Sequence, residues 1–115
     1  MCGIAGLVSR NPETLIGPML ESIEHRGRDD QGVWLSEAID DSGNRVCLGH
    51  RRLAIIDPTP AGHEPMLSPD GRYVLTFNGE IYNYRELRDE LRPRGHQFKT
   101  DCDAEVLLAA IAEWG

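Results

Sequence analysis

The sequence predicts an α+β domain, because segments with the spacing of β-strands and segments with the spacing of α-helices succeed one another along its 115 residues. Residues 3–8 form a short, almost wholly apolar run, as expected for a strand that is buried on both faces. Near the other end of the chain, the apolar residues of segment 103–114 recur along one helical face. The segments between them complete an expected order of strand, helix, strands, helix, strand and helix.

A helix is predicted where apolar side chains recur at helical spacing between residues 15 and 23. Pro18 interrupts this pattern, and proline is tolerated only in the first turn of a helix. The helix is therefore expected either to begin near Gly17 or to be kinked there. Gly27 follows at the place of a helix-ending glycine, so we expect it to stop the helix.

The middle of the chain is predicted to be β-structure, because each apolar run there is bounded by Gly, Pro, Asp or Asn. The strand-like runs are residues 32–36, 46–50, 53–56 and 73–77. Segment 57–62 holds two prolines and a glycine and is predicted to be a surface loop. Asn83 is expected to cap a further helix, with Glu86 reaching back to the cap, and Gly95 is expected to end it.

Composition argues against several classes of partner. The formal net charge is −7, and an acidic surface repels nucleic-acid phosphates and anionic lipids. No apolar stretch approaches the roughly 20 residues of a membrane span, and the first residues lack the basic region of a secretory signal. The three cysteines form no C-x-x-C pair, which argues against a disulfide framework or a zinc ribbon. We expect a cytoplasmic protein with neither nucleic acid nor a membrane as its partner.

Cys2 is a candidate nucleophile because it directly follows the initiator Met1. Removal of Met1 would leave one residue that carries both a thiol and a free α-amine. A typical α-amine has a pKa of about 7.7 to 8.0 and a typical thiol one of about 8.5, so a proton passes readily between them near neutral pH. The alternative interpretation, from local sequence alone, is a small buried structural cysteine.

The pair Asn78-Gly79 has two interpretations. It is the strongest short signal for a tight hairpin turn, and a strand-like run precedes it. The residues that follow, however, lead into a helix cap rather than into a clear return strand. The alternative is an oxyanion site, in which the Asn side-chain amide and the Gly backbone N–H point at one developing negative charge.

Two charged pairs also allow a structural or a functional interpretation. Arg51 and Arg52 lie between two strand-like runs, where arginines ordinarily form a solvated sheet edge. Asp101 and Asp103 precede the last helix, which such residues ordinarily cap. One Arg and one Asp could instead bind the two charged ends of a free amino acid. No metal site is expected, because the histidines match no common ligand spacing. These histidines are His25, His50 and His63.

Taken together and in this order, the motifs resemble the glutamine-hydrolysing domain of asparagine synthetases, a class-II, N-terminal-nucleophile glutamine amidotransferase domain. The resemblance covers the whole chain. The segments that carry it are residues 1–6 (MCGIAG), 25–27 (HRG), 49–57 (GHRRLAIID), 77–83 (FNGEIYN) and 103–108 (DAEVLL). Several motifs in a fixed order are a more specific signal than any one of them.

The resemblance implies a role for each matched residue. Cys2 would be the nucleophile that attacks the side-chain amide of glutamine, with Asn78 and Gly79 as the oxyanion donors. Arg52 would hold the α-carboxylate of the substrate, and Asp103 its α-ammonium group. Three further residues would line the pocket, namely Leu53, Ile55 and Glu80.

The resemblance also implies a fold, a four-layer α/β/β/α sandwich of two antiparallel sheets flanked by helices. Residues 1–115 would be the N-terminal part of a longer amidotransferase domain, and in the family a synthetase domain follows on the same chain. Without the closing strands of the sandwich, an inner sheet face or edge is expected to be exposed. We therefore expect the 115-residue chain to be marginally stable or to self-associate.

The implied function is the glutaminase half of an amidotransferase, which hydrolyses glutamine through a Cys2 thioester and supplies ammonia for ATP-dependent synthesis of asparagine from aspartate. The implied partners are L-glutamine, the synthetase domain and a second copy in a homodimer. No cofactor is expected in this domain, whereas ATP and Mg²⁺ would bind the synthetase domain. Two alternatives stay open: a different ammonia acceptor, and a catalytically silent module that binds glutamine or a partner.

Overall fold

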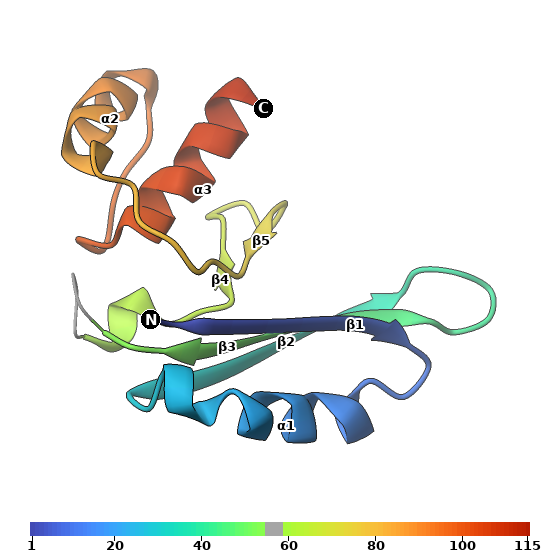
Figure 1. Cartoon of the computed structure of the whole chain (residues 1–115). Helices are drawn as coiled ribbons and strands as arrows, with labels where there is room; N and C mark the ends of the chain where they lie inside the picture. Colours follow the sequence, from blue (N-terminus) through green and yellow to red (C-terminus); the bar gives the residue numbers. More distant parts are fainter. Residues whose placement is uncertain (55–58) are drawn as a thin grey trace.

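A three-stranded antiparallel sheet forms one half of the structure, a computed structural model that describes residues 1–54 and 59–115 (Figure 1). Its strands lie in the order β1-β3-β2. They are β1 (Gly3–Ser9), β2 (Asp30–Ala38) and β3 (Arg45–Arg52). The strands predicted at residues 3–8, 32–36 and 46–50 are therefore confirmed, and each is longer than its apolar run.

The core of this half lies between the sheet and helix α1 (Glu13–Ser22), which runs along one face of the sheet (Figure 1). Leu20 is fully buried there, together with Ile16 and with Cys47 of β3. Burial of a side chain such as Leu20 contributes roughly 1.5–3 kcal/mol. Gly49 makes this close packing possible, because a Cβ atom at that position would lie 2.9 Å from a methyl carbon of Leu20.

Helix α1 begins at Glu13 and contains Pro18, so the prediction of a start near Gly17 is wrong. Burial of the apolar stripe against the sheet outweighs the loss of one helical hydrogen bond at the proline. Pro18 is exposed, as is Thr14, whose carbonyl loses that bond. Water can therefore satisfy the carbonyl.

Gly27 does not end the helix in the way that its position predicts. Helix α1 ends at Ser22, and a short 3₁₀ turn (Glu24–Arg26) intervenes. Gly27 then adopts an extended conformation with φ of −158° rather than the left-handed conformation of a helix-ending glycine. Gly27 allows the backbone at this position to lie close to β3, because a Cβ atom here would be only 2.6 Å from the backbone of Arg51 and Arg52.

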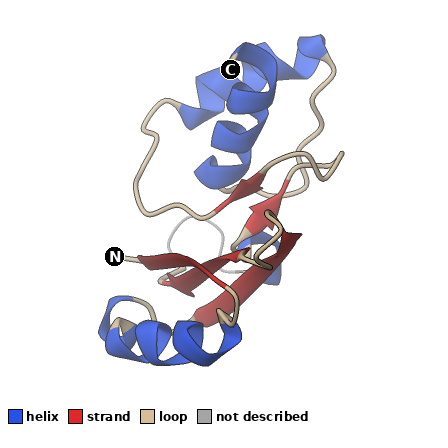
Figure 2. Cartoon of the chain, turned by 90° about the vertical axis from the view of Figure 1, so that its right-hand side faces the viewer, coloured by secondary structure: helices blue, strands red, loops and turns tan. Residues whose placement is uncertain are grey.

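The second half of the structure combines a short β-ribbon with two helices (Figure 2). The ribbon is formed by β4 (Met66–Leu67) and β5 (Val74–Leu75), and the helices are α2 (Tyr84–Leu91) and α3 (Asp103–Trp114). Leu91 and Val106 are fully buried, one in each of these two helices, which pack against each other. The helix predicted at residues 103–114 is confirmed at those bounds.

Several predictions in this half need correction. The strand predicted at residues 73–77 is shorter, β4 was not predicted, and no strand lies between α2 and α3, a stretch that the structure describes in full. Asn83 precedes α2 but its side chain makes no capping hydrogen bond, so the predicted capping pair with Glu86 is wrong. Gly95 does end this region, in the left-handed conformation with φ of +99°.

The segment that follows β3 departs from a predicted strand at residues 53–56. Leu53 and Ala54 form no strand, and Ile55 and Ile56 lie outside the described residues. In the predicted loop 57–62, the described part contains a 3₁₀ turn (Pro60–Gly62), and Gly62 is buried rather than at the surface.

The α+β class is confirmed, and helix α1 and the second half of the structure lie on opposite faces of the larger sheet (Figures 1 and 2). Side chains of β1 alternate between these faces. Ala5 and Leu7 pack against the core beside α1. Ile4 and Val8 therefore point to the opposite face, where they are 50% and 58% exposed. Within the described residues, no helix is long and apolar enough to cross a lipid bilayer.

Candidate active site

A pocket of about 350 Å³ lies where the end of the larger sheet meets the second half of the structure. It is lined by the segment before β1, the end of β3, the segment between β5 and α2, and the start of α3. All the predicted site residues that the structure describes line it. They are Cys2, Arg52, Leu53, Asn78, Gly79, Glu80 and Asp103. Ile55 lies outside the described residues.

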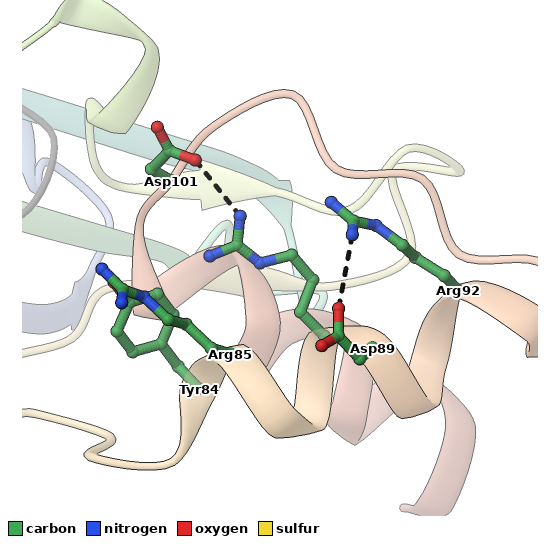
Figure 3. Close-up of a pocket in the computed structure, with 6 residues that line it drawn as sticks. Tyr84, Arg85, Asp89, Arg92 and Asp101 are labelled. Carbon is green, nitrogen blue, oxygen red and sulfur yellow. Dashed lines mark hydrogen bonds and ion pairs between the residues drawn. The ribbon is translucent and has the colours of Figure 1, made fainter.

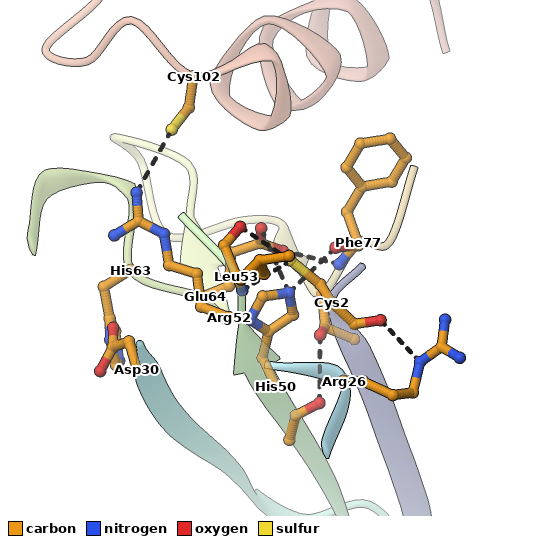
Figure 4. Close-up of polar contacts among 12 residues, drawn as sticks. Cys2, Arg26, Asp30, His50, Arg52, Leu53, His63, Glu64, Phe77 and Cys102 are labelled. Atoms are coloured by element: carbon orange, nitrogen blue, oxygen red, sulfur yellow. Dashed lines mark hydrogen bonds and ion pairs between the residues drawn. The ribbon is translucent and has the colours of Figure 1, made fainter. Parts of the chain in front are cut away.

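Cys2 reaches the pocket because β1 pairs with β3, which places the residue before Gly3 beside the end of β3. The backbone N–H of Leu53 donates to Cys2 Sγ at 3.3 Å, and Sγ lies 3.6 Å from the carbonyl oxygen of Leu53 (Figure 4). On its other side, the Cys2 carbonyl accepts a hydrogen bond from Nε of Arg26 at 2.9 Å. The thiol is thus held at the pocket while Cys2 stays partly exposed.

The three cysteines differ in their surroundings. Cys47 is the buried structural cysteine, and burial raises the pKa of its thiol. Cys2 and Cys102 are both partly exposed and both line the pocket. The interpretation of Cys2 as a buried structural residue is therefore wrong.

Asn78 and Gly79 follow β5 and lead towards α2 without a return strand. Gly79 does not adopt the positive φ that a two-residue hairpin turn requires, so the hairpin interpretation is wrong. A glycine is needed at residue 79 for a different reason. A Cβ atom there would lie 2.8 Å from the ring of Phe77.

Arg52 does not form a solvated edge, because it is 7% exposed at the end of β3. Its guanidinium donates to the carbonyl of Thr59 at 2.6 Å. The same group lies 3.9 Å from Sγ of Cys102 (Figure 4). Gly62 leaves room for this group, since any Cβ atom there would collide with it. Arg51 instead contacts the carbonyl of Gly27 at 2.9 Å.

Asp103 is the first residue of α3 and is 8% exposed. Cys102 is the capping residue of this helix, without a capping hydrogen bond from its side chain, so neither Asp101 nor Asp103 is the capping residue that was predicted. Asp103 instead accepts the backbone N–H of Ile81 at 2.9 Å. It thereby connects the start of α3 to the segment that follows Gly79.

Two buried residues near the pocket were not predicted as site residues, Glu64 and His50. Glu64 lines the pocket, and burial raises the pKa of its carboxyl to about 7. Asp103 raises this pKa further, whereas the Phe77 N–H and Arg52 oppose the shift. His50 is 1% exposed, and burial lowers the pKa of its imidazole.

The histidines do not converge on one site. His50 contacts the carbonyl of Phe77, His63 lies 2.5 Å from a carboxylate oxygen of Asp30, and His25 is exposed. Across residues 1–54 and 59–115, no group of three or more side chains is arranged to hold a metal ion.

A second hollow of about 600 Å³ lies along α2 (Figure 3). It contains none of the predicted site residues. Its arginines are engaged by neighbouring side chains, since Arg88 lies 3.2 Å from Asp101 and Arg92 lies 3.4 Å from Asp89. The remaining basic residue, Arg85, donates to the hydroxyl of Tyr84 at 3.2 Å. The convergence of a thiol, a guanidinium and a carboxylate distinguishes the first pocket from this one.

Comparison with known proteins agrees with the chemistry of the first pocket. A family described as the glutamine amidotransferase domain matches residues 1–115. The chain belongs to this family. This amidotransferase domain is 44% identical, over 99% of its length, to asparagine synthetase [glutamine-hydrolyzing] 1 of Bacillus subtilis. It is 44% identical over 98% of its length to a putative asparagine synthetase of Mycobacterium tuberculosis, and 38% identical over its whole length to the enzyme of Zea mays.

These relatives are much longer than the amidotransferase domain described here. The chain covers 18% of the Bacillus subtilis protein and of the Mycobacterium tuberculosis protein, and 19% of the Zea mays protein. The match in each case is to part of a larger protein.

Proposed function

We propose that this amidotransferase domain hydrolyses the side-chain amide of glutamine, with Cys2 as the nucleophile. One observation carries the proposal: the partly exposed thiol of Cys2 shares a single pocket with Arg52, Asp103 and the pair Asn78-Gly79. The family match and the names of the relatives support the same reaction class.

The reaction would begin when Met1 is removed, so that Cys2 carries a free α-amine. The thiol then attacks the carboxamide carbon and its proton passes to that amine. Asn78 and Gly79 donate hydrogen bonds to the oxyanion of the tetrahedral intermediate. The C–N bond breaks, the nitrogen takes a proton from the same amine, and ammonia leaves. Water finally hydrolyses the Cys2 thioester and releases glutamate.

Substrate selection would depend on the two charged groups of the pocket. A guanidinium binds a carboxylate through a planar pair of N–H donors, and Arg52 carries five donors in all, so its contact with Thr59 is compatible with substrate binding. Asp103 would bind the α-ammonium group of glutamine. A peptide bond at either end would leave one of these buried charges unpaired, which disfavours peptides relative to the free amino acid. Leu53, Ile55 and Glu80 would line the remainder of the pocket.

The ammonia would serve ATP-dependent synthesis of asparagine from aspartate in a synthetase domain on the same chain. The names of the relatives support this acceptor, and their greater length supports an additional domain. ATP and Mg²⁺ would bind that domain rather than this one. We place the reaction in the cytoplasm. We also assign the complete domain to the four-layer N-terminal-nucleophile fold, because the packing of α1 on one face of the β-sheet would form one helix layer and one sheet layer of that sandwich.

A second candidate function is a catalytically silent module that binds glutamine or a partner. The exposure of Ile4 and Val8 on the larger sheet favours it, because an incompletely covered sheet face weakens the support that a catalytic site needs.

Ammonia release from glutamine by the purified chain separates the two candidates. We expect release from the unchanged protein and none from Cys2→Ala. Cys102→Ala is the matched control, since it removes the other thiol that lines the pocket and is expected to keep the release. A folded sample without Cys2-dependent release would sink the enzyme function and favour the silent module.

A further inference from the structure

Two buried ionisable side chains have no part in the reaction proposed above, and both contact the same peptide segment. His50 and Glu64 are 1% and 7% exposed, and they meet at the backbone of Phe77 (Figure 4). Phe77 directly precedes Asn78 and Gly79 in the sequence.

Side chains bind both polar groups of the Phe77 backbone. The N–H of Phe77 donates to Oε1 of Glu64 at 2.7 Å, and its carbonyl oxygen lies 3.1 Å from Nε2 of His50. A carbonyl can only accept, so Nε2 of His50 must carry the proton of this contact. The ring nitrogen is also 3.6 Å from Oε2 of Glu64, which joins the two side chains.

The β-ribbon does not itself fix this segment, because β5 ends at Leu75. Thr76 contacts the larger sheet through its hydroxyl, which donates to the carbonyl of Gly49 at 3.2 Å. Beyond Thr76, the contacts of Phe77 with His50 and Glu64 set the direction in which the backbone enters Asn78.

We propose that His50 and Glu64 are positioning residues that hold the Phe77 backbone, and thereby aim the oxyanion donors Asn78 and Gly79 at the substrate beside Cys2. This inference rests on the proposed glutaminase function. It adds residues that act through Phe77 rather than by touching the substrate's reacting atoms.

The larger sheet supports both positioning residues. His50 lies within β3, where it pairs with Ile4 of β1 and with Gly32 of β2. Gly32 leaves room for the Glu64 backbone to pack against the sheet, because any Cβ atom at residue 32 would collide with the carbonyl oxygen of Glu64. The rigid sheet therefore determines where the two side chains present their polar atoms to Phe77.

Loss of the Glu64 acceptor would leave the half-buried N–H of Phe77 without its hydrogen-bond partner, which is unfavourable. A shift of the segment relieves this cost and moves the oxyanion donors. Misplacement by about 1 Å or loss of one oxyanion donor lowers the rate roughly 100-fold. The effect belongs to the transition state, because the oxyanion does not exist in bound glutamine.

The test compares Glu64→Ala with Glu64→Gln in glutamine hydrolysis. Glu64→Ala removes the acceptor, and we expect kcat to fall roughly 10- to 100-fold while KM changes less than about threefold. Glu64→Gln keeps an acceptor oxygen for the Phe77 N–H and is expected to restore kcat. His50→Phe keeps a ring but removes the donor, so it should also lower kcat.

Alkylation of Cys2 by iodoacetamide is the matched control measurement, because this reaction forms no oxyanion. We expect an alkylation rate equal to that of the unchanged protein in all three variants. An unchanged kcat in Glu64→Ala would overturn the inference while the glutaminase function stands. A loss in Glu64→Gln equal to that in Glu64→Ala, or a parallel loss of alkylation, would also overturn it. Absence of ammonia release from the unchanged protein would overturn both proposals.

Discussion

Glu64 is a buried ionisable residue, and its titration should make the stability of the whole protein depend on pH. The pKa of its carboxyl is about 7 in the folded chain, raised mainly by burial from an ordinary value of 4.5. Between pH 4.5 and 7 the folded state therefore holds a proton that the unfolded state has released. Relative to the unfolded state, protonated Glu64 therefore stabilises the fold fully below pH 4.5, and this contribution is lost as the pH rises through 7. His50 acts in the opposite sense, since its lowered pKa favours the folded state above pH 6.5.

Replacement of Glu64 by Gln should remove the first of these effects. At pH 8 we expect the free energy of unfolding of Glu64→Gln to exceed that of the unchanged protein by on the order of 1–3 kcal/mol, and the difference to vanish near pH 4.5. Urea unfolding at the two pH values measures this. Glu21→Gln, at an exposed position of α1, is the control and should change neither value. An identical pH dependence in Glu64→Gln and the unchanged protein would contradict the assignment.

Asp103 should matter for substrate binding through its charge. Asp103→Asn keeps an oxygen that can accept the N–H of Ile81, but it removes the partner for an α-ammonium group. Because a hydrogen bond to a charged group contributes about 1.5–3 kcal/mol, we expect KM for glutamine to rise roughly 10- to 100-fold. Asp101→Asn is the matched control, since Asp101 is exposed and pairs with Arg88. Equal KM values in the two variants would argue against the proposed role.

Contacts between elements decide how the two halves of the chain are built. Helix α1 packs on the sheet because Gly49 leaves room for Leu20 and Ile16. The same sheet carries Cys2 and Arg52 at its end, so the packing of α1 and the position of the pocket depend on one structure. Disturbing this packing should therefore lower the stability of the sheet that carries the pocket.

Substitution of Gly49 by Ala tests the contact with α1. The new methyl group would lie 2.9 Å from a methyl carbon of Leu20 and 3.0 Å from one of Ile16, and overpacking of this kind costs about 1–3 kcal/mol. Gly6→Ala places the same methyl group on the opposite face, where the nearest atom is 3.4 Å away. It should be neutral or stabilise by roughly 0.5–1 kcal/mol. Thermal unfolding of both variants measures the difference, and equal stabilities would contradict this account of the packing.

The elements predicted best are those whose pattern lies in neighbouring residues. Helix α3 repeats its apolar stripe within 103–114 and was predicted at its observed bounds. Strand β4 has two residues and depends on Val74 and Leu75 as partners, so its own sequence gives little signal. Gly27 was assigned to the wrong role because its requirement comes from β3, which is distant in sequence.

The candidate site shows the same limit. Its residues were predicted from their resemblance to a family, and their convergence depends on long-range pairing such as that of β1 with β3. Glu64 was missed because its contact with Phe77 and its burial both arise from tertiary structure. His50 lies within a recognised motif, and that position was the one signal that could have drawn attention to it.

At the scale of the whole molecule, the incomplete cover on the face of the larger sheet opposite α1 is the main structural liability. Ile4 and Val8 are 50% and 58% exposed on the side opposite α1, as the sequence led us to expect. Exposed apolar strands favour association between chains. The structure thus links a site with converging functional groups to a scaffold that is incompletely covered.

We expect the 115-residue chain to self-associate in a concentration-dependent manner. Replacing Ile4 and Val8 together by Thr keeps strand propensity and makes this face more polar, so association should weaken. Leu15→Thr, at an exposed position of α1, should have no such effect. Analytical ultracentrifugation over a range of concentrations measures these differences. A monomer with a cooperative thermal transition for the unchanged protein would contradict the expectation.

The covalent intermediate is the feature on which the proposed function most directly depends. Acid quenching of a reaction with glutamine, followed by peptide mass spectrometry, locates any glutamyl thioester. We predict a glutamyl group on the peptide that begins at Cys2, with Met1 removed and no adduct on Cys102. A chain that turns over glutamine without an adduct at Cys2, or with Met1 still in place, would contradict Cys2 as the nucleophile whose own α-amine is the base.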